Sequence, residues 1–247
     1  MMRIEKREGE TLAELVERVR FENNIAADVP ITYAGRLDPM ASGEMIMLVG
    51  ADVHLKDSYI GIDKEYEFDI AFGVTSDTLD ALGIVRHNLP LSAQVRNMLT
   101  ADELARIATE FVGEYEQAYP AYSSKPIEGV PSFVHARAGN RVEAPRHKVV
   151  LRSVEVIATR EVRAVDLARE AIERVGCVSG DFRQEAVVDS WREFSHAAGA
   201  EMLIVASLRA TVGSGFYIRT FAEELAAKAG TIGMAWRIRR TRCIIEE

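Results

Sequence analysis

Residues 64–72 carry the pattern that most restricts how this chain can fold. Large apolar side chains occupy every second position there: Tyr66, Phe68, Ile70 and Phe72. Acidic side chains fill most of the positions between them. Because successive side chains of a strand point to opposite faces, this alternation predicts a β-strand with one face buried. The chain must therefore build a sheet that another layer covers.

Other strands are less sharply marked. Residues 45–49 form a continuous apolar run, which predicts a fully buried strand. Residues 149–157 and 202–212 are rich in residues that favour strands, although their alternation is less regular.

Four segments predict helices. Thr11 begins a capping box ahead of an apolar stripe over about 12–21. Thr100 begins a second capping box. The apolar stripe behind it reaches Phe111, and Gly113 can end this second helix. Residues 165–175 and 185–197 show further helical patterns, joined by a turn at 176–180. Because helices and strands do not alternate strictly, we expect an α+β fold with a mixed, largely antiparallel sheet flanked by helices.

Composition narrows the class of protein. At 247 residues and 48% hydrophobic content, the chain is long enough for one elaborated domain. No stretch reaches the roughly 18 apolar residues of a membrane span, and the N-terminus lacks the apolar segment of a signal peptide. We therefore expect a cytoplasmic protein with no membrane partner. Cys177 and Cys243 lack metal-binding spacing and predict neither a disulfide framework nor a zinc site.

The net charge of −8 argues against indiscriminate coating of nucleic acid, because Lys and Arg supply most non-specific affinity for phosphate. Two segments are nevertheless locally basic. Residues 209–242 hold seven Lys and Arg against two Glu, and residues 119–152 hold six against two. Each segment either faces phosphate or is an ordinary solvated face.

The most unusual segment is YAGRLDPMASG at residues 33–43, between the first predicted helix and the strand at 45–49. Gly35 and Gly43 permit a tight path around Asp38. An Asp-Pro pair alone is a common turn signature, so a case for chemistry at Asp38 depends on the rest of the chain.

Several blocks, in order, resemble motifs of the TruB family of tRNA pseudouridine synthases. Residues 33–43 are similar to its GxLDPxAxG catalytic loop. KREGET at 6–11 resembles its KPxGxT entry segment, with Arg7 in place of proline. KEYEF and GVTSDTLDALG, within 64–83, resemble KxYxF and GxxTDTxDxxG. QAYPAYSSK at 117–125 resembles the QxPPxYSAxK segment before an RNA-gripping thumb loop, with Lys125 one position early. GSGFYIRT at 213–220 and IRRTR at 238–242 resemble SGTYIRT and LRRTR.

The resemblance implies a pseudouridine synthase fold and the isomerisation of uridine 55 in the T-loop of tRNA. In that reaction the N1–C1′ bond breaks, the base reorients, and a C5–C1′ bond forms. No electrons are exchanged, so we expect no cofactor and no metal, only a positioned carboxylate nucleophile and a pocket for the detached base. The sequence contains no P-loop, zinc-protease or complete dinucleotide motif.

The resemblance implies roles for the residues of this chain that stand at matching positions of the family's motifs. Asp38 matches the family's catalytic aspartate and Arg219 its active-site arginine, since a nearby cation favours a charged carboxylate and fixes its direction. Tyr66 matches the tyrosine that packs on the target base, and Ile238 takes the place of a leucine beneath it. Taken without the resemblance, Tyr66 could be a core residue and Arg219 a surface contact. A cation at a helix start needs a compensating acid.

Tyr33 is the main departure, because it stands where many bacterial members have a histidine that helps to hold the T-loop while the uridine flips. Both side chains are flat and can stack on a base. We therefore predict that the role of this position is positional here, and that an inactive but folded Tyr33→Phe protein would contradict it.

The resemblance also sets expectations for domain organisation. We expect residues 1–247 to form a single catalytic domain with a thumb-like loop at about 120–148 and a helical insertion at about 164–199. Many relatives continue into a C-terminal PUA domain, whereas this sequence stops five residues after Arg242, so we expect no PUA domain. The expected partner is the T-arm of tRNA, bound by a monomer with no obligate protein partner.

Three other interpretations compete. A non-catalytic RNA-binding or tRNA-folding module could keep this fold, although the retained Asp38, Tyr66 and Arg219 disfavour it. A glycoside hydrolase would need a second carboxylate, and none stands out. A calcium loop at residues 77–83 fails because acids are missing at the required spacing, which makes that loop a structural turn.

Overall fold

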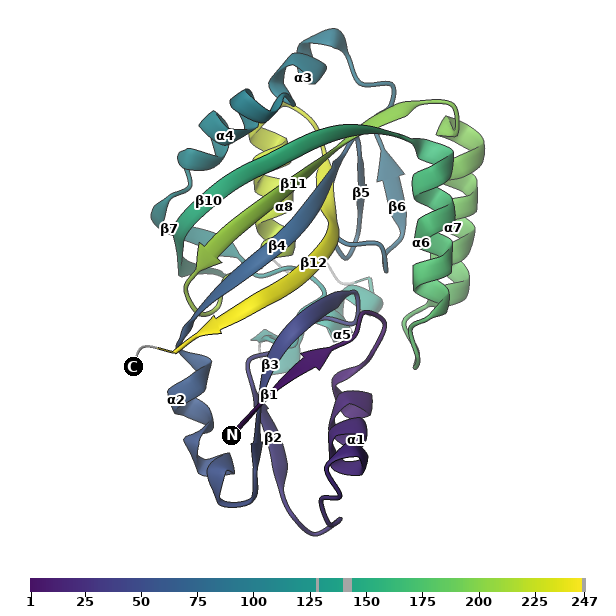
Figure 1. The fold of residues 1–247 in the computed structure, drawn as a ribbon. Coiled ribbons are helices and arrows are strands. Elements are labelled where there is room, and N and C mark those ends of the chain that lie inside the picture. The colour runs from purple at the N-terminus through teal and green to yellow at the C-terminus, as the bar shows by residue number, and fades with distance from the viewer. Residues whose placement is uncertain (128, 140–143, 246–247) are drawn as a thin grey trace.

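A computed structural model describes residues 1–127, 129–139 and 144–245 (Figure 1). Its centre is an eight-stranded sheet in the order β1-β3-β12-β4-β11-β10-β7, with β2 paired to β3 off this path. Every pairing in this sheet is antiparallel except β12 with β3. The predicted α+β class with a mixed, largely antiparallel sheet is therefore confirmed.

The strands of this sheet come from both halves of the chain. Their bounds are β1 (Met2–Lys6), β2 (Ile31–Ala34), β3 (Ala41–Val49), β4 (Asp63–Phe72), β7 (Gly113–Ala118), β10 (Arg146–Arg163), β11 (Met202–Val212) and β12 (Gly233–Ile244). Two short antiparallel pairs lie outside it: β5 (Val74–Ser76) with β6 (Val85–His87), and β8 (Pro126–Ile127) with β9 (Val130–Pro131).

The helices lie over the sheet faces and at its ends. Their bounds are α1 (Leu12–Glu22), the 3₁₀-helix η1 (Gly50–Leu55), α2 (Lys56–Ile60), α3 (Ala93–Met98), α4 (Ala101–Thr109), α5 (Ser132–Arg137), α6 (Ala164–Gly176), α7 (Gln184–Ala198) and α8 (Ile218–Lys228). The expected thumb-like loop at 120–148 includes residues 128 and 140–143, which lie outside the described residues.

All four predicted helices form. The Thr11 capping box is complete, since its hydroxyl accepts from the Glu14 amide while the Glu14 carboxylate accepts from the Thr11 amide. Thr100 caps α4 in the same way from its own side chain. That helix ends at Thr109, earlier than predicted, because the chain tightens into three successive i→i+3 hydrogen bonds between residues 107 and 112.

The strands differ more from prediction. β11 matches 202–212, but β10 is twice the predicted 149–157 run and β3 begins at Ala41 rather than at residue 45. β10 carries register shifts at Leu151/Ser153 and at Val156/Ala158. Because each irregularity breaks the two-residue period, alternation does not reveal such a strand.

The two faces of the sheet are covered differently. Helices α1, α4 and α8 pack on one face, where the alternating side chains Phe68, Ile70 and Phe72 are buried. On the other face, α6 and α7 lie side by side against one end of the sheet (Figure 1), where Ala71 and Trp236 join their core. This explains why β4 buries both faces at its end, although the sequence pattern marks only one.

Candidate active site

Asp38 lies at the bend between β2 and β3. Hydrogen bonds within the bend and from the buried Lys6 hold its backbone. The Asp38 carbonyl accepts from the Ala41 amide at 3.0 Å. The fully buried Lys6 ammonium donates to the Ala41 carbonyl at 2.6 Å and to the Pro39 carbonyl at 3.3 Å. Burial lowers the pKa of Lys6 to about 8. The entry segment of the chain therefore fixes the backbone that follows Asp38.

Gly43 ends the bend where β3 runs parallel to β12. Its φ is +113°, and a β-carbon there would lie 2.2 Å from the Arg240 carbonyl oxygen. Only glycine fits this close approach of two backbones. The Arg240 side chain turns back and donates to the Glu44 carbonyl at 2.6 Å, which closes the loop against the sheet.

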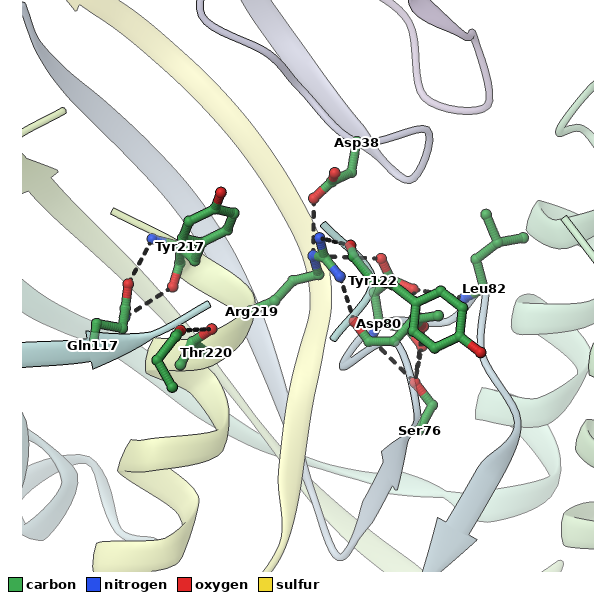
Figure 2. A network of polar contacts seen from close by, with 11 residues as sticks. Asp38, Ser76, Asp80, Leu82, Gln117, Tyr122, Tyr217, Arg219 and Thr220 are labelled. Carbon is green, nitrogen blue, oxygen red and sulfur yellow. Dashed lines mark hydrogen bonds and ion pairs between the residues drawn. The ribbon is translucent and has the colours of Figure 1, made fainter. Parts of the chain in front are cut away.

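Arg219, the second residue of α8, donates hydrogen bonds to three separate segments of the site (Figure 2). Its Nε donates to Asp38 Oδ2 at 2.9 Å. Its Nη1 donates to the Thr78 carbonyl at 2.6 Å, and its Nη2 donates to the Tyr122 carbonyl at 3.1 Å. The guanidinium is almost completely buried, whereas 44% of the Asp38 side chain is exposed. Arg219 thus aims Asp38 from a fixed position.

A second acid compensates the buried cation. Asp80 Oδ2 lies 3.9 Å from Arg219 Nε. Asp80 Oδ1 accepts from the Thr78 hydroxyl at 2.6 Å and from the Leu82 amide at 3.0 Å. Burial raises the pKa of Asp80, while Arg219 opposes that rise. The predicted need for an acid beside a cation at this helix start is therefore met twice, by Asp38 and Asp80.

The start of α8 is held by the strand that carries the QAYPAYSSK block. Gln117 is fully buried and accepts from the Tyr217 amide at 2.8 Å, while its amide group donates to the Tyr217 carbonyl at 3.2 Å (Figure 2). The Thr220 hydroxyl donates to the Ala118 carbonyl at 3.3 Å. These bonds fix the residue on each side of the Ile218–Arg219 pair.

The structure brings Asp38, Tyr66, Arg219 and Ile238 together around one cleft of about 280 Å³. Tyr66 on β4 and Ile238 on β12 form its floor, with 7% and 8% of their surface exposed. Burial raises the pKa of Tyr66, so its hydroxyl stays protonated at neutral pH. The cleft thus combines a carboxylate with an aromatic and a branched apolar surface.

Tyr33 lies on the other side of Asp38. It lines a neighbouring pocket that shares Asp38 and Arg219 with the cleft. Its ring is partly buried against the core, and the Lys56 ammonium lies 5.8 Å from the ring centre. The hydroxyl makes no hydrogen bond to any described residue. The four other predicted site residues therefore line the two pockets that share Asp38.

The basic segment at 209–242 is largely neutralised, which favours an ordinary solvated face. Arg209 pairs with Glu67 and Glu155, and Arg237 with Glu170. Arg36 and Lys125 line the cleft, are exposed and have no carboxylate partner among the described residues. Exposed positive charge is therefore available at the rim of the site.

Sequence reasoning missed two members of the site. Asp80 and Tyr122 both stand inside the quoted motif blocks, but neither was assigned a role, and residues 77–83 were expected to be only a structural turn. That loop is a turn, yet its Thr78 carbonyl and Asp80 carboxylate support Arg219. Spacing could not reveal this, because 139 or more residues separate the loop from Arg219.

Two surveys cover the described residues. No group of three or more His, Cys, Asp and Glu side chains there has an arrangement that could hold a metal ion. No helix in this part of the chain is long and apolar enough to cross a membrane.

Solved structures share this fold. A Cbf5-Nop10-Gar1 complex contains a chain that matches 96% of this one with a TM-score of 0.54 and 16% identity, over 46% of that chain. An H/ACA RNP bound to a substrate RNA containing 2'-deoxyuridine gives a TM-score of 0.52 at 15% identity, over 97% of this chain and 45% of that one.

Sequence comparison defines the family. The model for TruB family pseudouridylate synthase (N terminal domain) matches residues 24–180. This chain belongs to the TruB family, and the expected pseudouridine synthase fold is confirmed.

Individual relatives agree with this assignment. The tRNA pseudouridine synthase B of Aquifex aeolicus (strain VF5) is 34% identical over 67% of this chain and 55% of its own length. That of Opitutus terrae (strain DSM 11246 / JCM 15787 / PB90-1) is 29% identical over 96% of this chain and 78% of its own length. The match to the Aquifex relative thus spans about half of that protein.

Proposed function

We propose that this chain is a tRNA pseudouridine synthase that isomerises uridine 55 in the T-loop, with Asp38 as its nucleophilic carboxylate. The observation that carries the proposal is the Asp38–Arg219 pair. A half-exposed carboxylate faces a cleft and is aimed by a buried guanidinium at 2.9 Å. Such a fixed nucleophile beside a pocket is what breaking and remaking a glycosidic bond requires.

The cleft suits a detached uracil. Tyr66 offers a flat ring, and Ile238 offers an apolar surface beside it, so the base keeps contact with the floor of the cleft while it turns. The reaction balances internally. The base loses its bond from N1 to C1′, gains one from C5 to C1′, and exchanges a proton at C5 for one at N1. In this proposal the protonated Tyr66 hydroxyl, which belongs to a side chain lining the same cleft, assists that proton movement.

In this proposal, cations and aromatic rings at the rim of the cleft bind the tRNA. Arg36 and Lys125 lack carboxylate partners among the described residues and can therefore bind phosphate. Tyr33 in the neighbouring pocket offers a face on which an unstacked base can rest. The proposal includes a cytoplasmic monomer that needs no obligate protein partner. Size-exclusion chromatography with light scattering tests the oligomeric state.

The rival functions fare less well against the geometry. Asp80 is a second acid near Asp38, but it is buried and already accepts two hydrogen bonds, so it is not free to act as the second acid of a glycoside hydrolase. A non-catalytic RNA-binding module would not need the Asp38–Arg219 geometry. It stays the alternative that the experiment must separate.

The direct test uses the purified protein and an unmodified tRNA transcript without added cofactor or metal. Pseudouridine is mapped by carbodiimide-blocked primer extension. We expect a stop that reports position 55 with the wild-type protein and none with Asp38→Asn, which keeps the side-chain shape. Equal binding of tRNA by both proteins, measured by filter retention, shows that the variant has lost chemistry alone. Tight binding without modification by the wild type would support the non-catalytic module instead.

A further inference from the structure

The linker between α6 and α7, residues 177–183, reaches the site from the helical pair. Asp181, Phe182 and Arg183 line the pocket that contains Tyr33 and that shares Asp38 and Arg219 with the cleft. We infer that Arg183 is a positioning residue, which holds Tyr122 so that the Tyr122 carbonyl meets Arg219. This role rests on the proposed function and assigns a task to the helical pair.

Arg183 grips two groups at once. Its Nη1 donates to Asp77 Oδ2 at 2.8 Å and its Nη2 donates to Asp77 Oδ1 at 3.3 Å, a paired geometry that fixes the guanidinium plane. The same guanidinium lies 4.6 Å from the centre of the Tyr122 ring. The Tyr122 hydroxyl in turn donates to Asp77 Oδ2 at 3.1 Å. Arg183, Asp77 and Tyr122 therefore form a closed triangle, named here the outer triangle.

The outer triangle is anchored on the sheet side. Asp77 Oδ1 accepts from the Ile84 amide at 2.8 Å, which fixes the carboxylate within its own loop. That loop also supplies the Thr78 carbonyl to Arg219 Nη1. The Tyr122 carbonyl receives Arg219 Nη2. Of the three hydrogen bonds that Arg219 donates, one thus ends on Tyr122, a member of the outer triangle, and one on Thr78, the residue after Asp77.

Backbone strain marks the same two loops. Among the described residues, three non-glycine residues have positive φ: Asn24, Leu79 and Arg183. Leu79 follows Asp77 in its loop, and Arg183 ends the linker. Such conformations are strained and persist where surrounding contacts enforce them. The Arg183–Asp77 ion pair joins the two strained loops.

The linker also holds the segment beyond Tyr122. Arg137 at the end of α5 donates to Asp181 Oδ2 at 3.2 Å. The amides of Ser132 and Phe133 donate to the Lys125 and Ser123 carbonyls at 2.8 and 3.2 Å. Arg183 and Asp181 therefore brace the two ends of one segment, residues 122–137, that borders the cleft.

The activity test compares Arg183→Gln and Arg183→Lys with Arg192→Gln. Arg192 lies on α7, is 62% exposed and, among the described residues, pairs only with Asp189, so it is the matched control. We expect Arg183→Gln to lower kcat about tenfold and to raise KM less than threefold, because the variant misplaces Arg219 rather than removing a substrate contact. We expect Arg183→Lys to keep more of the wild-type kcat than Arg183→Gln, because lysine keeps the positive charge beside Asp77. The recovery is partial, because an ammonium cannot bind Asp77 in the paired geometry. Adding Asp77→Asn to Arg183→Gln should lower kcat no further.

Amide hydrogen exchange tests the positioning role of Arg183 without an activity assay. We expect amide hydrogen exchange at Ser132 and Phe133 to be about tenfold faster in Arg183→Gln than in wild type, and unchanged in Arg192→Gln. Unchanged exchange in Arg183→Gln, or equal loss of kcat in both variants, overturns the positioning role. If the wild type makes no pseudouridine, the proposed function fails, and the exchange data still decide whether Arg183 braces the segment.

Discussion

Two networks meet at Arg219, and they differ in burial. The inner one consists of Asp38, Arg219 and Asp80, and the outer triangle consists of Asp77, Tyr122 and Arg183. In the inner network Arg219 and Asp80 are 4% and 8% exposed, and Asp38, which faces the cleft, is 44% exposed. In the outer triangle Arg183 and Asp77 are 27% and 32% exposed. Because water screens exposed charges, the attraction between Arg183 and Asp77 is screened more strongly than that between Arg219 and Asp80.

This difference in burial implies different tasks for the inner network and the outer triangle. The inner network sets the direction of Asp38, the carboxylate that we propose as nucleophile, so in that proposal a small displacement there affects the chemical step directly. The outer triangle acts through Tyr122, and its loss can be partly absorbed by neighbouring contacts. We therefore expect changes in the inner network to abolish turnover and changes in the outer triangle to reduce it.

The largest effect is expected from Arg219→Lys. Lysine keeps the charge but cannot reach Asp38, the Thr78 carbonyl and the Tyr122 carbonyl in three fixed directions. We expect kcat to fall by about 100-fold or more, with little change in KM, in single-turnover assays on tRNA.

Arg209→Lys is the control for that experiment. Arg209 also pairs with two acids, Glu67 and Glu155, but it lies on the exposed sheet face away from the cleft. Its substitution should change kcat less than about twofold. A similar loss in both variants would mean that the inner network has no special part in turnover.

Lys6→Met tests the support beneath Asp38 through the pH dependence of stability. The folded-state pKa of Lys6 is about 8, below the ordinary lysine value of 10.5, because the ammonium is buried. Between these two values the unfolded state binds more protons, so this lysine makes the free energy of unfolding rise with pH. The rise is on the order of 3 kcal/mol from pH 8 to 10.5.

The measurement is urea unfolding from pH 7 to 10.5. The difference between wild type and Lys6→Met should grow across that window in favour of the wild type. Lys228→Met, which alters an exposed lysine paired with Glu110, should show no such growth. A constant difference would show that Lys6 keeps an ordinary pKa in the folded protein.

The contrast between the networks also shows how much the sequence could reveal. Asp38, Tyr66, Arg219 and Ile238 were predicted because each stands in a motif block, and the structure brings them around one cleft. The alternation at 64–72 likewise predicted the buried face of β4. Local patterns and motif identity suffice where each residue has its own signal.

In the outer triangle, Asp77 and Tyr122 stand in motif blocks, but Arg183, which joins them, had no such signal. Arg183 stands in a linker with no motif, and its partners Asp77 and Tyr122 are more than 50 residues away in sequence. The segment at 164–199 was predicted as two helices, but nothing in its pattern indicates that its linker folds back to the site. Such contacts depend on how α6 and α7 pack on the sheet, which only the tertiary structure fixes.

The smallest effect is expected at Tyr33, which faces the outer triangle across their shared pocket. Its hydroxyl makes no hydrogen bond to any described residue, so Tyr33→Phe should keep kcat and KM within about threefold of wild type. Tyr33→Ala removes the ring and should raise KM about tenfold, since stacking of a base on an aromatic ring contributes about 1–3 kcal/mol. Steady-state kinetics on tRNA measure both. A folded but inactive Tyr33→Phe would mean that this position moves a proton, and the pocket would then belong to the chemistry rather than to substrate binding.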